Sequence, residues 1–61
     1  MKVTVTDLMM LIESLGYQIH KYEDFSEKAR AKGYTISADA YDDYITKMNE
    51  LRDKLIAYIK R

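Results

Sequence analysis

The chain has 61 residues, with ten Lys and Arg balancing ten Asp and Glu, and it contains no Cys. This length provides one small domain, and the lack of Cys excludes a disulfide framework, a thiol nucleophile and Cys-ligated metal sites. Zero net charge argues against a dominant phosphate-binding surface, while 48% hydrophobic residues is too high a fraction for a disordered tail.

The first residues differ in pattern from the rest of the chain. Residues 2–5 alternate polar and apolar side chains and are rich in β-branched residues, which predicts a short extended arm. They lack the unbroken apolar core of a signal peptide, and no apolar run approaches the ~18 residues of a membrane span. We therefore expect a cytoplasmic protein without membrane contact.

A helical period follows the arm and predicts a helix over residues 6–32. Apolar residues recur at steps of three and four, and taking Leu8 as heptad position a puts this stripe on positions a, d and e. Thr4 or Thr6 can cap the start, and Gly33 provides the left-handed residue that ends a helix. The members of the stripe are Leu8, Leu11, Ile12, Leu15, Ile19, Tyr22, Phe25 and Ala29.

Gly16 introduces an alternative for this segment. Gly inside a helix costs about 1 kcal/mol relative to Ala, so the helix could end at Leu15 and residues 17–22 could form a second strand. The apolar stripe nevertheless keeps its phase from Leu15 to Ile19 across the glycine. We therefore predict one continuous helix.

The second helix carries the clearest pattern of the chain and is predicted over residues 38–60, after a loop at 33–37. Its apolar residues follow a repeated three-four spacing for nearly three heptads, which is typical of a helix-packing seam. Ser37 is the predicted N-cap, and acidic residues at the start with basic residues at the end suit the helix dipole. The residues of this second stripe are Tyr41, Tyr44, Met48, Leu51, Leu55 and Tyr58, with Ile45 and Ile59 at position e.

These elements predict an all-α fold, an antiparallel two-helix hairpin with a short extended N-terminal arm. A hairpin has a single helix–helix interface, and each apolar stripe is wider than one neighbouring helix covers. Chains this short rarely fold alone without disulfides, metals or oligomerisation. We therefore expect a homodimer or higher symmetric oligomer, most simply a four-helix bundle. The expected self-interface residues are Leu8, Leu11, Ile12, Leu15, Ile19, Tyr41, Tyr44, Met48, Leu51, Leu55 and Tyr58.

A second apolar region is expected at the open end of the hairpin, on outer helix positions. It offers a surface for a protein partner, unless the N-terminal arm folds back or pairs with its symmetry mate and covers it. Met side chains suit adaptable packing in either case. The candidate partner residues are Met9, Met10, Tyr17 and Ile56 in this region, together with Tyr34 in the predicted loop.

No residues match a catalytic, cofactor or metal motif. His20 is the only histidine, and it falls at position f among acidic residues, as expected of a solvated polar face. The Glu-x-x-His pattern of bundle di-iron sites is absent, because residue 17 is Tyr. We therefore expect a non-enzymatic regulatory, adaptor or inhibitor protein that acts through protein–protein contact. The six Tyr leave open a small anionic ligand, such as a nucleotide, held between protomers.

The order of a short strand followed by two helices resembles ribbon–helix–helix DNA-binding dimers. The resemblance covers the first half of the chain and implies a strand with Val3 and Val5 buried and Lys2, Thr4 and Thr6 facing DNA. The predicted first helix is about twice too long for that family, and the chain has no excess positive charge. Binding of nucleic acid is therefore the alternative function rather than the expected one.

Overall fold

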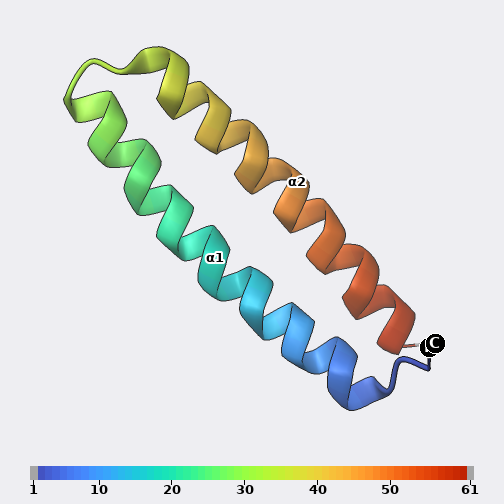
Figure 1. Cartoon of the computed structure of the whole chain (residues 1–61). Helices are drawn as coiled ribbons and strands as arrows, with labels where there is room; N and C mark the ends of the chain where they lie inside the picture. Colours follow the sequence, from blue (N-terminus) through green and yellow to red (C-terminus); the bar gives the residue numbers. More distant parts are fainter. Residues whose placement is uncertain (1, 61) are drawn as a thin grey trace.

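The computed structural model describes residues 2–60 and contains two α-helices joined by a tight turn (Figure 1). α1 spans Val5–Ala31 and α2 spans Thr35–Ile59. The helices run antiparallel and form a rod of 44 × 20 × 14 Å, with the start of α1 and the end of α2 at the same end. The all-α two-helix hairpin predicted from the sequence is confirmed.

A capping box fixes the start of α1. The backbone N–H of Asp7 donates to Thr4 Oγ1 over 3.1 Å, and the Thr4 N–H donates to Asp7 Oδ2 over 3.0 Å. These two bonds satisfy donors that the first helical turn leaves without partners, and the Asp7 charge suits the helix dipole. The extended backbone therefore ends at Thr4, and Val5 is already helical.

The turn between the helices is shorter than the loop predicted at 33–37. Gly33 adopts a φ of 81°, its N–H donates to Arg30 O, and the Tyr34 N–H donates to Ala29 O. This pair of bonds is the Schellman motif, in which the N–H groups of two consecutive residues satisfy carbonyls of the last turn of α1. α2 can therefore begin at Thr35, and the predictions of a start at 38 and an N-cap at Ser37 are wrong. Tyr34 is the N-cap and makes no side-chain capping bond.

α1 continues through Gly16 without interruption, so the alternative of a strand at residues 17–22 is wrong. Gly16 faces α2, where a Cβ atom would lie 3.6 Å from Arg52 Nε. The absence of a side chain at this position leaves room for the Arg52 side chain to lie between the helices. The packing of α1 on both sides of the glycine outweighs its unfavourable helix propensity.

The two helices meet along heptad positions a and e. All fourteen residues at these positions between Leu8 and Ile59 are buried or half-buried. We call this set the seam: Leu8, Ile12, Leu15, Ile19, Tyr22, Ser26 and Ala29 from α1, and Ala38, Tyr41, Ile45, Met48, Arg52, Leu55 and Ile59 from α2. Position d, the other half of each apolar stripe, lies outside it.

Candidate protein-interaction face

Four aromatic rings from both helices form a cluster on one side of the seam. The Tyr22 ring lies 5.1 Å from that of Tyr44 and 5.8 Å from that of Tyr41, measured between centroids. Phe25 adds an edge-to-face contact with Tyr22 at 5.6 Å and lies 5.8 Å from Tyr41. Aromatic pairs at these separations stabilise by about 0.5–1.5 kcal/mol beyond their buried area. The cluster joins the two helices near the turn.

The same side of the hairpin carries further apolar side chains along the rest of the rod. Leu11 precedes Phe25 by two heptads, and Leu51 and Tyr58 follow Tyr44 by one and two heptads, so all lie on one side. Leu11 is 51% exposed, Tyr44 52%, Leu51 48% and Tyr58 61%. We call this surface the apolar face: Leu11, Leu15, Tyr22 and Phe25 from α1, and Tyr41, Tyr44, Leu51, Leu55 and Tyr58 from α2.

The hairpin exposes more surface than a monomer of its size should. Its accessible surface is 5160 Å² for 7.2 kDa, whereas folded monomers of this mass expose ~4,100 Å². The excess of ~1,000 Å² is close to the ~800 Å² that each partner buries in a standard protein–protein interface. Among the described residues no large side chain is fully buried. One hairpin therefore leaves its core open on one side.

Lysines border the apolar face on both helices. Lys21, Lys28, Lys47 and Lys54 occupy position g, next to the exposed apolar row at d. Lys21 Nζ lies 5.6 Å from the Phe25 ring centroid, which is a cation–π contact. Lys28 and Lys47 pair with the aspartates four residues before them, at 2.9 and 3.3 Å. The zero net charge therefore hides an uneven distribution, because every Asp and Glu except Asp7 lies at outer positions b, c and f.

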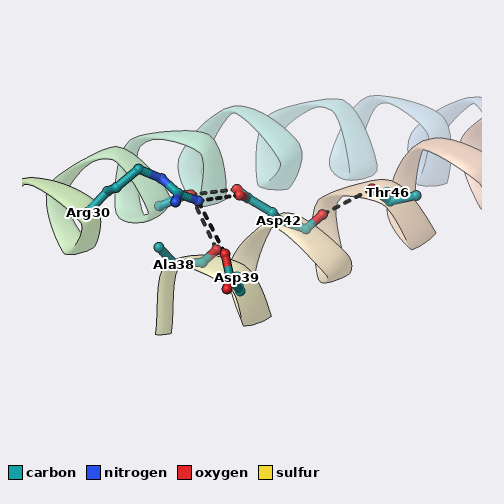
Figure 2. A network of polar contacts seen from close by, with 6 residues as sticks. Arg30, Ala38, Asp39, Asp42 and Thr46 are labelled. Atoms are coloured by element: carbon teal, nitrogen blue, oxygen red, sulfur yellow. Dashed lines mark hydrogen bonds and ion pairs between the residues drawn. The ribbon is translucent and has the colours of Figure 1, made fainter. Parts of the chain in front are cut away.

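The opposite side of the seam is polar near the turn. Figure 2 shows Arg30 reaching from α1 towards Asp39 and Asp42 of α2, with Nη2 2.6 Å from Asp42 Oδ2 and 3.6 Å from Asp39 Oδ1. The buried Ser26 Oγ donates to Asp42 Oδ1 over 2.5 Å. These contacts fix which side of each stripe turns inward, because they draw position b of both helices together.

The expected self-interface residues divide into two groups. Leu8, Ile19 and Met48 are buried between α1 and α2, and so they stabilise the hairpin itself rather than offering an exposed contact. The residues that are half or more exposed, or half-buried at the margin of the seam, are Leu11, Ile12, Leu15, Tyr41, Tyr44, Leu51, Leu55 and Tyr58. All of these except Ile12 belong to the apolar face.

The candidate partner residues do not form one surface. Met9 and Ile56 both occupy position b at the open end, on the side opposite the apolar face, and Met9 is 54% exposed. Met10 and Tyr17 point outward from α1 and are 62% and 78% exposed. Tyr34 is in the turn, at the other end of the rod, so it lies far from the rest (Figure 1).

Side chains that could ligate a metal ion do not cluster in the described part of the chain. No group of three or more His, Asp or Glu between residues 2 and 60 could hold a metal ion. A recess beside His20 is lined by Tyr17, Lys21 and nearby acidic residues, all from the outer surface of α1. Neither helix, as described, is long and apolar enough to cross a membrane.

Sequence reasoning left Tyr22 and Phe25 out of the expected interface, although both lay on the predicted stripe. Their regular heptad positions were the signal that could have included them, because Tyr22 is at a and Phe25 at d. The lysine border was equally visible as a repeat at position g. Comparisons with protein family models, curated proteins and solved structures find no match to this chain.

Proposed function

We propose that the chain works as a homodimeric four-helix bundle, a non-enzymatic regulatory, adaptor or inhibitor protein that acts through protein–protein contact. The observation that supports this proposal is the apolar face, which extends from Leu11 to Phe25 on α1 and from Tyr41 to Tyr58 on α2 and includes four side chains about half exposed or more. Monomeric proteins rarely leave so large a contiguous apolar surface in water.

A second copy of the chain is the occupant that fits this face best. It has the same length and width, and packing two hairpins face to face gives the square arrangement of a four-helix bundle. The excess exposed surface of ~1,000 Å² is what a two-fold interface of standard size would remove from water. The outer positions c and f, which carry seven of the ten acidic residues, stay outside this interface and can contact a further protein.

The experiment is a pair of charge substitutions on the two sides of α2. Leu51→Glu puts a carboxylate in the middle of the apolar face, and Asn49→Glu puts the same group at an exposed position b outside it. Burying an unpaired charge in an interface costs several kcal/mol, so Leu51→Glu should weaken the dimer by about 100-fold or more. Sedimentation velocity measures this. Equal dimer affinity for the two variants would contradict the proposal.

A further inference from the structure

A polar residue interrupts the apolar face at its midpoint. Position d of α1 carries Leu11, Gln18 and Phe25 in turn, and Gln18 is exposed in the hairpin. Residue 18 is also the middle residue of α1, which spans Val5–Ala31. The middle residue of α2, which spans Thr35–Ile59, is Lys47 at position g. Full overlap of two hairpins with like helices antiparallel therefore puts their two-fold axis next to these two residues.

Face-to-face packing with two-fold symmetry allows two arrangements. In one, α1 lies antiparallel to the partner's α1 and α2 to the partner's α2. In the other, each α1 lies antiparallel to the partner's α2. The apolar residues suit both arrangements, because position d is Leu, Phe or Tyr at five of its seven places in the two helices, with Gln18 and Ser37 as the exceptions. Gln18 and the charged residues at position g decide between them.

We infer that α1 packs against α1 of the second copy, with the two Gln18 side chains hydrogen-bonded to each other on the two-fold axis. This inference rests on the proposed homodimer. An amide side chain is both donor and acceptor, so two Gln residues related by symmetry can satisfy each other. In the other arrangement Gln18 would face the partner's Leu51, and its amide would be buried without a partner at a cost of about 1–3 kcal/mol.

The residues at position g favour the same arrangement. With α1 against α1, Lys28 lies level with the partner's Asp7 at both ends of the pair, and Lys21 lies level with Ser14. The one contact between like charges is Lys47 with its own mate near the axis. With α1 against α2, Lys21 would instead meet the partner's Lys47 in both halves of the dimer. Like charges across an interface disfavour that pairing.

Gln18 therefore determines specificity within the interface, at some cost in dimer affinity. A single polar residue in an apolar helix seam is known to select register and orientation in coiled coils, because only one alignment pairs it with itself. Gln18 has this role in the hairpin, because the apolar residues suit both arrangements.

Disulfide crosslinking tests the arrangement directly, because the chain has no Cys of its own. A mixture of Ser14→Cys and Lys21→Cys chains, which both keep Gln18, should form a mixed disulfide on mild oxidation, with a yield about tenfold above a mixture of Ser14→Cys and His20→Cys chains, because His20 lies on the outer surface. In the other arrangement the two α1 helices lie diagonal to each other in the bundle, ~14 Å apart, which is too far for a disulfide. A mixture of Lys21→Cys and Lys47→Cys chains should give little mixed disulfide between the two variants, as measured by mass spectrometry.

The outcomes separate this inference from the proposed function. If light scattering shows a dimer and the Ser14→Cys and Lys21→Cys chains crosslink to each other, the inference is supported. If the protein is dimeric but the Ser14→Cys and Lys21→Cys chains do not crosslink, or the Lys21→Cys and Lys47→Cys chains crosslink to each other instead, the inference fails and the homodimer stands. If the protein is a folded monomer, both fail.

Discussion

Arg30 and Asp42 join the last turn of α1 to the second turn of α2, with Arg30 Nη2 2.6 Å from Asp42 Oδ2. Asp42 also accepts a hydrogen bond from Ser26, which is buried in the seam. One carboxylate therefore holds two groups of α1, at the side of the hairpin opposite the aromatic cluster. This pair of contacts sets the rotation of the two helices about their axes.

Replacing Asp42 by Ala should lower the free energy of unfolding by about 1–2 kcal/mol. The ion pair is half exposed and contributes ~1 kcal/mol or less, while the charge-assisted bond to Ser26 adds the remainder. Asp43→Ala is the control, since Asp43 pairs with Lys47 on a well-exposed surface. Its effect in urea unfolding should stay below ~0.5 kcal/mol. Equal effects of the two substitutions would mean that the Asp42 contacts do not stabilise the hairpin.

Thr4→Ala should destabilise α1 by about 1 kcal/mol, because it removes the oxygen that accepts the Asp7 N–H. Thr6→Ala removes the same side chain two residues later, where the structure assigns it no capping bond, and should have little effect. Helix content and thermal midpoint by circular dichroism compare them. A larger loss for Thr6→Ala would show that the helix begins at a different residue.

The two glycines should respond in opposite directions to the same substitution. Gly16→Ala should stabilise the protein by about 0.5–1 kcal/mol, because its Cβ would meet Arg52 at an ordinary contact distance of 3.6 Å. Gly33→Ala should destabilise it by about 1 kcal/mol, because φ is 81° at this residue. Urea denaturation measures both changes. Destabilisation by Gly16→Ala would show that the space beside Arg52 is smaller than the structure indicates.

Thermal stability should depend on protein concentration. If the open side of the hairpin core is closed by a second copy, unfolding and dissociation are coupled, and mass action raises the midpoint as concentration rises. Melts followed by circular dichroism at about 5, 50 and 500 μM protein should give thermal midpoints that rise with concentration. A midpoint that is constant over this range would indicate a hairpin that folds alone.

The helices were predictable because their signals are local. The unbroken phase across Gly16, the capping threonine and Gly33 each act within one or two turns, and the structure agrees with them. The start of α2 was missed because Ser37 is a better N-cap by type than Tyr34. The Schellman bonds of the preceding helix decided the boundary instead.

The face that closes the hairpin could not be chosen from the apolar pattern. The stripe covers positions a, d and e, and the a/e half is as apolar as the a/d half. The bond between Ser26 and Asp42 favours the a/e half, but these two residues are sixteen apart in sequence and their pairing depends on the register of the two helices. Ser26 and Arg52 are polar members of the seam, so the apolar spacing did not predict either of them.

Binding of a second copy to the apolar face would double the molar mass of the protein. Light scattering coupled to size exclusion measures the molar mass at two protein concentrations tenfold apart, with helix content by circular dichroism on the same samples. We expect a helical protein at twice 7.2 kDa at both concentrations. A helical, folded protein at 7.2 kDa would contradict it.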